Sequence, residues 1–440
     1  MSPRQLVIQL LDRYERTDAF ADLLLEHELS QSQLSKPDKS LAQEIFFGVI
    51  RWRKRIDWIV TQFFLGDYAK APRPIRYVLQ SAFYQLIFMD RIPAYAVIHE
   101  AVELAKMKGS DYWGKKINAI LRTLQRGQRP IHYPDIAAEP VQSIAVMHSH
   151  PEWMVSRWID RFGMEETIAL CKANNTSPRL SIRVNSLRTS AEELQDLLLQ
   201  YKIEATKSEY LENFLGAKQL PDLNNFQPFQ QGLFTIQDVS AGLACKLLDP
   251  APGDKIVDLC AAPGGKSTFL AELSGDQAEI MAIDVNQSRL NLVEQNVQRL
   301  GSKSIRLIQA NGTIFSCDSV DKVILDAPCS GLGVLAKRVD LRWKRTFTQI
   351  KEISRLQYDL LTNAAKLLKP GGILVYCTCT IEPEENENMI EQFLTEHQDF
   401  IIEPASEYVS SAVVNASGFV YTYPHRHGID GSFAVRLIKE

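Results

Sequence analysis

The chain has 440 residues, which is too long for one ordinary domain and predicts two or three. Its apolar content of 45% suffices for packed cores, but no apolar run approaches the roughly 18 residues of a membrane helix, and the N-terminus carries too many charges for a signal peptide. Seven cysteines, an odd number without a CxxC pair, argue against a disulfide framework or a structural zinc site, and predict a reduced, cytoplasmic protein.

The net charge of −4 hides a basic segment in the first third of the chain. Residues 51–129 contain 15 Lys/Arg and 6 Asp/Glu. An excess of this kind can attract a polyanion such as RNA. A set of solvated helix faces explains the same count, so charge alone leaves both interpretations open.

Residues 1–130 have the periodicity of helices throughout. Apolar side chains at helical spacing predict one helix over 40–65, with RWRKR on its other face, and further helices over 75–90, 96–109 and 115–127. Short connections between them predict a compact antiparallel bundle. Residues 131–150 are rich in proline and polar residues, and we interpret them as a linker.

Two strand-like pieces, PRLSIRVNSLRTS and GLFTIQDVSAGL, flank a helix at 191–201 and predict a small α/β subdomain over 151–235. Arg183 and Asn185 alternate on the first piece, where they face either RNA or solvent. From Lys255 onward, buried strands alternate with helices. The fold class is therefore α/β, with a doubly wound, largely parallel Rossmann-like sheet whose ligands bind at the carboxyl ends of its strands.

Four polar positions follow strands of this sheet. The first is the Gly-rich turn in DLCAAPGGKS, and the others are Asp284, Asn311 and Asp326. A carboxylate after the second strand is typical of ribose binding. The turn matches neither a P-loop nor GxGxxG, so we expect a nucleoside carrier and not a triphosphate. Taken alone, the turn is also compatible with a plain strand-to-helix connection, and Asp284 with a helix cap.

Two cysteines come from separate strand ends of the same edge, Cys329 in LDAPCSGLG and Cys379 in VYCTCTIEPEENE. A thiolate that adds to carbon 6 of a pyrimidine makes carbon 5 nucleophilic towards a methyl sulfonium, and a second thiol can help release the product. An acid such as Asp326 can stabilise the charge that develops. The competing interpretation is that both cysteines pack as small apolar side chains.

Together these motifs resemble the RNA 5-methylcytosine methyltransferases that use S-adenosylmethionine. The pieces GVIRWRKRIDW, AFYQLIFMDRIPAYAVIHEAVELAK and INAILR resemble the NusB-type RNA-binding domain, which points to the branch that acts on small-subunit ribosomal RNA. The resemblance implies that Cys379 is the nucleophile and that Cys329 assists product release. It also implies a set of cofactor contacts: Cys260, Ala261, Ala262, Pro263, Gly264, Gly265, Lys266, Asp284, Asn311 and Asp326.

Three positions depart from the family pattern: Asn311 stands where Asp is usual, Val339 where Pro is usual, and Ser432 where an aromatic residue is usual. The expected organisation is a NusB-like helical RNA-binding domain (1–130), a linker (131–150), a small α/β RNA-binding subdomain (151–235) and a methyltransferase domain (236–440). We expect a metal-free monomer that methylates 16S ribosomal RNA. The alternatives are the same chemistry on transfer RNA, or a non-catalytic RNA-binding or antitermination factor, against which the two cysteines argue.

Overall fold

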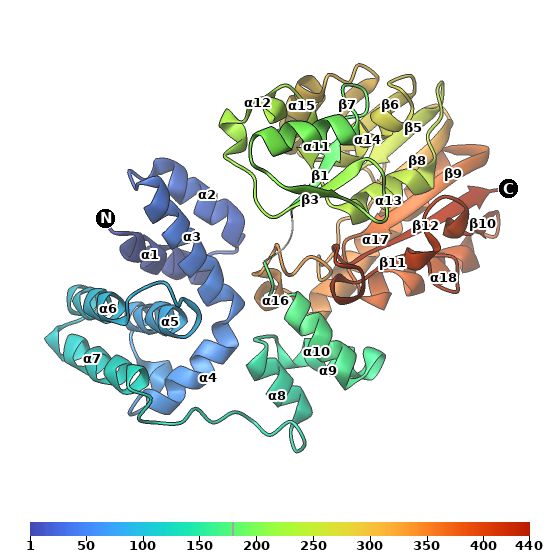
Figure 1. The fold of residues 1–440 in the computed structure, drawn as a ribbon. Coiled ribbons are helices and arrows are strands. Elements are labelled where there is room, and N and C mark those ends of the chain that lie inside the picture. The colour runs from blue at the N-terminus through green and yellow to red at the C-terminus, as the bar shows by residue number, and fades with distance from the viewer. Residues whose placement is uncertain (178–179) are drawn as a thin grey trace. The chain divides into compact units, whose positions relative to one another are not determined.

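The structure, a computed structural model, describes residues 1–177 and 180–440. The chain forms two compact units, Met1–Thr176 with Leu335–Lys344, and Ser177–Val334 with Arg345–Glu440 (Figure 1). Pro178 and Arg179, which begin the strand-like piece expected at 178–190, lie outside the described residues. Within the described ranges, no helix is both long and apolar enough to cross a membrane.

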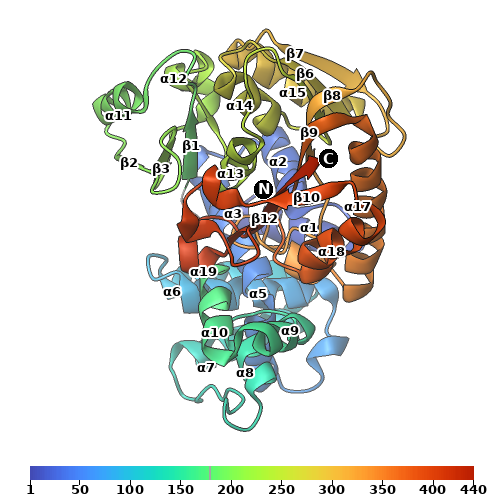
Figure 2. The ribbon, with the colours of Figure 1, turned by 90° about the vertical axis from the view of Figure 1, so that its right-hand side faces the viewer.

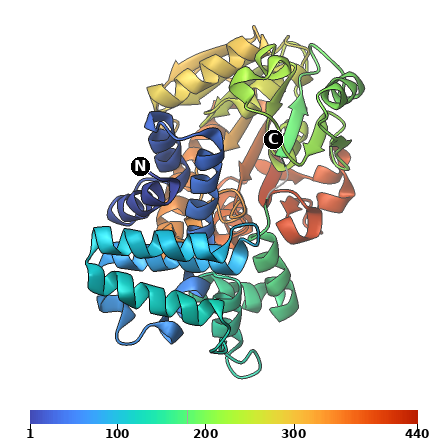
Figure 3. The ribbon, with the colours of Figure 1, turned by 60° about the vertical axis from the view of Figure 1, so that its left-hand side comes forward.

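The first unit is helical, as the periodicity predicts. The cyan helices α5, α6 and α7 lie side by side (Figure 3), and their apolar faces share one core with α1 and α3. Ser2 begins α1 with a capping box, because its hydroxyl accepts from the Gln5 N–H while the Gln5 side chain accepts from the Ser2 N–H. The helices are α1 (Pro3–Arg16), α2 (Ala21–Gln31), α3 (Lys36–Arg51), α4 (Arg53–Phe63), α5 (Arg73–Phe88), α6 (Ala94–Lys108), α7 (Asp111–Gln125), α8 (Pro140–Met147), α9 (Glu152–Phe162), α10 (Met164–Ala173) and α16 (Leu341–Lys344).

The single helix expected over 40–65 is wrong, because the chain forms α3 and α4 with a turn at Trp52 between them. The Trp52 ring stacks on Phe88 of α5 with ring centroids 4.7 Å apart, and the Arg55 guanidinium lies over the same ring. Apolar spacing continues across the turn, so periodicity alone does not reveal the break.

A segment from the second half of the sequence packs in the first unit. Val339 of Leu335–Lys344 lies in the helical core, and the Arg342 guanidinium is buried, donating to the carbonyl oxygens of Ser149 at 3.2 Å and Asn174 at 3.0 Å. The chain therefore leaves the second unit soon after Cys329 and returns at Arg345. α8, α9 and α10 also belong to the first unit, and α8 lies within the stretch expected as a linker. The four-segment division stays a prediction.

The second unit begins with a small antiparallel sheet of order β2-β3-β1-β4, which confirms the α/β subdomain. Its helix α11 starts with a capping box between Ser190 and Glu193. The apolar faces of β1, β3 and α11 form a separate core. Its elements are β1 (Leu180–Val184), α11 (Ala191–Gln200), β2 (Ala205–Lys207), β3 (Phe214–Ala217), α12 (Gln227–Gln230) and β4 (Phe234–Ile236).

The large sheet has the order β10-β12-β9-β8-β5-β6-β7, with β11 paired to β12. The strands from β9 to β7 are parallel, and β12 is antiparallel to β9, which confirms a largely parallel doubly wound sheet. Helices α17 and α18 lie on one side of it, and α13 and α14 on the other (Figure 2). Burial on both faces explains why the central strands are continuous apolar runs.

The elements of this part are α13 (Val239–Leu248), β5 (Lys255–Leu259), α14 (Gly265–Leu273), β6 (Glu279–Asp284), α15 (Gln287–Leu300), β7 (Ile305–Gln309), β8 (Val320–Asp326), α17 (Phe347–Leu367), β9 (Leu368–Thr378), α18 (Glu387–Glu396), β10 (Phe400–Glu403), β11 (Val420–Thr422), α19 (Pro424–His427) and β12 (Ser432–Lys439). In register, Asp284 pairs with Gln309 and Asp326 pairs with Cys377. The carboxyl ends of β5 to β9 therefore share one edge, and every predicted site residue lies at that edge.

Candidate active site

The Gly-rich turn connects β5 to α14. Gly264 has φ +95°, and a Cβ there would lie 2.8 Å from Val293 Cγ1, so this glycine admits helix α15. A Cβ on Gly265 would have the Gln237 side chain as its nearest neighbour, at 3.4 Å, which is an ordinary van der Waals contact. Burial raises the pKa of Cys260 to about 12, so this thiol stays protonated at neutral pH and is unsuited to act as the nucleophile.

Asp284 ends β6, and only one of its two carboxylate oxygens accepts a hydrogen bond from the described residues. Oδ1 accepts from the Asn286 N–H at 2.9 Å, whereas the buried Oδ2 accepts no hydrogen bond from the described residues. The Arg289 guanidinium lies 3.4 Å from Oδ2. Because an unsatisfied buried acceptor is costly, this oxygen fits a ligand that brings hydroxyl donors, such as a ribose diol.

Asn311 follows β7 and is exposed. Its Oδ1 accepts from both the N–H and the hydroxyl of Thr313, at 3.1 and 3.0 Å. These two bonds use both lone pairs of the amide oxygen, so the NH₂ group is what remains for a ligand. Asn311 is therefore arranged to donate a hydrogen bond to a ligand at this position, whereas an aspartate would accept one.

Lys266 and Asp326 connect the cofactor turn to the end of β8. The Lys266 Nζ lies 2.6 Å from Asp326 Oδ2, and the carboxylate is partly exposed. Burial lowers the pKa of Lys266, but the charge of Asp326, the neighbouring Cys377 and Cys245 and the hydrogen bond to Asp326 together raise the pKa above its ordinary value. Lys266 is therefore a charged partner of Asp326 and not a spare phosphate ligand.

The two cysteines meet at the same edge. Cys329 Sγ lies 3.2 Å from Cys379 Sγ, and the Cys379 N–H donates to Cys329 Sγ at 3.4 Å. The hydrogen bond with Cys379 and burial raise the pKa of Cys329 well above its usual range. The structure thus brings together two thiols that are 50 residues apart in the chain.

Sequence reasoning missed the role of Arg183, which faces neither RNA nor solvent. Its guanidinium is buried and donates to Thr268 Oγ1 at 2.9 Å and Glu272 Oε1 at 2.8 Å, and also to the Gly265 carbonyl of the cofactor turn. Asn185 is likewise buried and donates to two main-chain carbonyls. No spacing reveals this contact, because the partners of Arg183 on α14 lie more than 80 residues away.

Arg183→Met should destabilise the second unit by about 3–5 kcal/mol, because it leaves the buried Glu272 carboxylate without its cationic partner. Denaturant unfolding followed by circular dichroism, which reports on the helices and strands of the second unit, measures this cost, because all six tryptophans lie in the first unit. Lys218→Met removes an exposed charge of the same subdomain and should change the free energy of unfolding little. The double variant Arg183→Met/Glu272→Met should recover most of the loss, and a failure to recover would show that Arg183 acts through other contacts.

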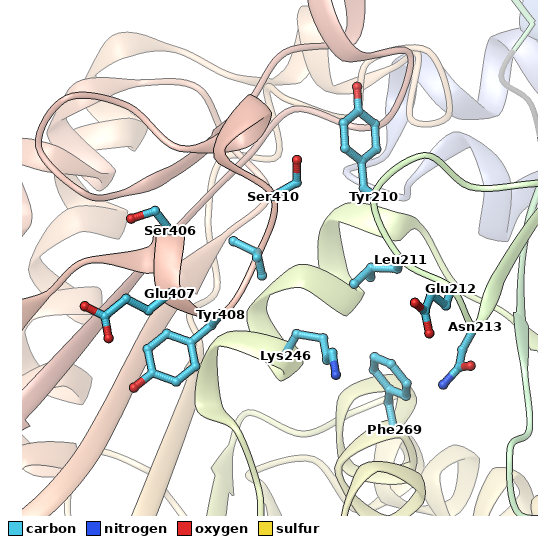
Figure 4. Close-up of a pocket in the computed structure, with 11 residues that line it drawn as sticks. Tyr210, Leu211, Glu212, Asn213, Lys246, Phe269, Ser406, Glu407, Tyr408 and Ser410 are labelled. Atoms are coloured by element: carbon cyan, nitrogen blue, oxygen red, sulfur yellow. The ribbon is translucent and has the colours of Figure 1, made fainter.

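A pocket of about 390 Å³ lies elsewhere in the second unit (Figure 4). Tyr210, Lys246, Phe269 and Tyr408 are among its lining residues, and the lining includes none of the residues predicted for cofactor binding or thiol chemistry. This pocket therefore does not mark the candidate active site, which is identified by the convergence of the strand ends.

Comparison with known families agrees with this geometry. Residues 245–438 match the model of the 16S rRNA methyltransferases RsmB/F, residues 1–126 match the NusB family, and residues 150–217 match the ferredoxin-like domain of RsmF/B-like methyltransferases. The NusB-like segment and the methyltransferase sheet expected from the sequence are thereby confirmed.

Curated relatives match over the full length. The chain is 36% identical to a probable ribosomal RNA small subunit methyltransferase B of Synechocystis sp., with all of both chains covered. It is 31% identical to the Bacillus subtilis protein of the same name, over 100% of this chain and 99% of the relative, and 32% identical to the ribosomal RNA small subunit methyltransferase B of Yersinia pseudotuberculosis, over 93% and 92%.

Two solved structures are also similar. The crystal structure of PH0851 covers 100% of this chain and 99% of its own, with TM-score 0.83 and 27% identity. That of NSun6 from Pyrococcus horikoshii with SFG, an S-adenosylmethionine analogue, covers 67% and 99%, with TM-score 0.61 and 26% identity. The chain therefore belongs to the ribosomal RNA small subunit methyltransferase B family, the S-adenosylmethionine-dependent 16S rRNA (cytosine-5)-methyltransferases.

Proposed function

We propose that Cys379 is the nucleophile of this 16S rRNA (cytosine-5)-methyltransferase and that Cys329 assists release of the methylated product. The observation that carries the assignment is the 3.2 Å approach of the two thiols at the strand edge that also holds the Gly-rich turn. Two thiols from separate loops have no packing need to meet there, whereas a covalent mechanism with an addition and a release step requires two groups.

In the proposed sequence, the Cys379 thiolate forms a bond to carbon 6 of the cytosine, which turns carbon 5 into an enamine nucleophile. S-adenosylmethionine supplies the methyl group. A base then takes the proton from carbon 5, the electron pair of that C–H bond restores the ring double bond, and the bond from carbon 6 to Cys379 breaks. Cys329, beside the sulfur that leaves, is placed to assist this last step.

For Asp326 we propose a role other than that of the acid expected from the sequence. Its Oδ2 lies 2.6 Å from the Lys266 Nζ. A carboxylate accepts hydrogen bonds, so we propose that Asp326 accepts from the exocyclic amine of the cytosine while Lys266 supplies positive charge beside the ring. A pair of this kind selects cytosine over uracil, which presents a carbonyl in place of the amine.

The residues proposed to bind the cofactor lie at the same edge of the sheet, at the carboxyl ends of the parallel strands. We assign the turn Cys260–Lys266 to the methionine part, the buried Oδ2 of Asp284 to the ribose diol, and the Asn311 amide to the base. These assignments leave Cys260 as a turn residue with φ +65°.

The test of the function is transfer of labelled methyl groups to purified 16S rRNA, followed by mapping of the modified base. We expect 5-methylcytosine in 16S rRNA and no label in a transfer RNA pool at equal concentration. Label confined to transfer RNA would contradict the assignment of 16S rRNA as the substrate. Label on a base other than cytosine would contradict the proposed mechanism.

Asp284→Ala should weaken S-adenosylmethionine binding by roughly ten- to hundredfold, the effect of losing a hydrogen bond to a charged acceptor, about 1.5–3 kcal/mol. Calorimetric titration of the cofactor measures the change. Glu294→Ala, which removes an exposed carboxylate from the neighbouring helix α15, should leave the affinity unchanged. Equal cofactor affinities of the two variants would contradict the assignment of Asp284 to the cofactor-binding site.

The cytoplasmic location and the monomeric state stay predictions. A reducing compartment suits a mechanism that needs two free thiols so close together, since all seven cysteines are free. Light scattering on the purified protein checks the monomer. The excess of basic residues at 51–129 is proposed to attract the ribosomal RNA, which predicts RNA binding that weakens steeply as salt rises.

A further inference from the structure

Glu385 lies six residues after Cys379, at the end of a short 3₁₀ turn, Pro383–Glu385, and is fully buried. Its carboxylate accepts two hydrogen bonds from the residue that follows Cys329. The Ser330 N–H donates to Oε1 at 2.7 Å, and the Ser330 hydroxyl donates to Oε2. A carboxylate on the Cys379 side of the site therefore holds the backbone on the Cys329 side.

Two further side chains complete this cluster. The Gln357 amide of α17 donates both to the Pro328 carbonyl at 2.9 Å and to Glu385 Oε1 at 3.1 Å. The Ser330 hydroxyl lies 2.8 Å from Thr380 Oγ1. The residues on both sides of Cys329 and the residue after Cys379 are thus connected through one buried carboxylate.

A buried carboxylate is costly unless it is well hydrogen-bonded, and here the named donors are neutral. Burial raises the pKa of Glu385 in spite of these bonds. An apolar side chain would fill the same space without that cost, so packing alone does not explain an acid at this position. Two of its bonds come from Ser330 in the loop that carries Cys329, and the third comes from Gln357 of α17, which also donates to Pro328 in that loop.

We propose that Glu385 is a positioning residue for product release, which holds Cys329 beside the Cys379 sulfur while the bond from that sulfur to carbon 6 breaks. The proposal rests on the roles assigned above to the two cysteines. Addition of Cys379 to the ring needs only the Cys379 thiolate. Release needs Cys329 beside the Cys379 sulfur, and therefore needs the loops that carry the two cysteines to be held at a fixed distance. A displacement of about 1 Å at a reacting group can slow a step by about 100-fold.

Glu385→Gln tests the proposal, because it keeps the size of the side chain but replaces one acceptor oxygen with a donor facing Ser330. We expect kcat to fall by about 100-fold and a covalent protein–RNA adduct to accumulate on a denaturing gel. Cofactor affinity should stay within a few-fold of the unsubstituted enzyme, because the turn at Cys260–Lys266 makes none of these bonds. Glu391→Gln, an exposed glutamate of α18, is the matched control and should form no excess adduct.

A purely structural role gives a different result: a lower melting temperature, with addition and release slowed together and no adduct. That result, or unchanged kcat, would overturn the proposal. If Glu385→Gln does not fold, Ser330→Ala decides, since it removes only the hydroxyl donor. An adduct in that variant supports the proposal and its absence overturns it. Cys329→Ala is run in parallel: if it too forms no adduct, the assignment of the cysteines has failed and not only the role of Glu385.

Discussion

Replacing Cys379 with alanine should abolish methylation of 16S rRNA while cofactor binding stays within a few-fold. The thiol is proposed to form the bond to carbon 6, and without that bond carbon 5 of cytosine is too weak a nucleophile to take a methyl group. Loss of a covalent nucleophile typically costs four or more orders of magnitude in rate. Methyl transfer from labelled cofactor, with cofactor affinity measured by calorimetry, checks both parts.

The matched control for this variant is Cys317→Ala. Cys317 is a partly exposed thiol in the same unit, outside the strand edge of the site, and its loss should leave the rate unchanged. Normal activity in Cys379→Ala would end the assignment of the nucleophile. Loss of cofactor binding in that variant would show instead that the substitution disturbs the turn.

Cys329→Ala should accumulate a covalent protein–RNA adduct that survives a denaturing gel. Cys379 can still add to the ring in this variant, and the methyl group can still be transferred, but the step that breaks the bond to sulfur lacks its second thiol. Each enzyme molecule should therefore retain about one labelled methyl group in RNA that stays attached to protein, and turnover should stop after the first cycle.

The double variant Cys329→Ala/Cys379→Ala should form no adduct, because it lacks the sulfur that bonds to the ring. An adduct in Cys379→Ala that is missing from Cys329→Ala would reverse the two roles. The two sulfurs lie only 3.2 Å apart, so either thiol could contact carbon 6 of the substrate. The experiment therefore has to distinguish the two assignments of nucleophile and releasing group.

Local pattern was enough to predict most of the second unit. Each central strand is a short apolar run followed by a polar residue, and parallel strands end at one edge, so Asp284, Asp326 and the turn at Cys260–Lys266 could be placed together without coordinates. The two cysteines followed from the same rule, because Cys379 comes directly after β9 and Cys329 comes shortly after β8 ends at Asp326. The resemblance to a family then supplied their roles.

Other features depend on contacts between distant residues. Arg183 has the appearance of a surface residue on a short strand, yet its charge is neutralised by Glu272 on another element. Glu385 belongs to an acidic run that resembles a solvated loop, and only its two bonds from Ser330 show that it is an internal acceptor. The break at Trp52 depends on a ring from α5. Sequence spacing contains no information on these partners.

The sequence by itself determined the class of fold and predicted the strand edge at which the candidate site residues meet. These follow from hydrophobic periodicity and from residue types at strand ends, which are local properties of the chain. Only the tertiary structure decided that the Cys329 and Cys379 sulfurs lie 3.2 Å apart, that Asp326 pairs with Lys266, and that Leu335–Lys344 packs with the helical unit. Burial and hydrogen bonding set these outcomes, and both depend on partners brought together by folding.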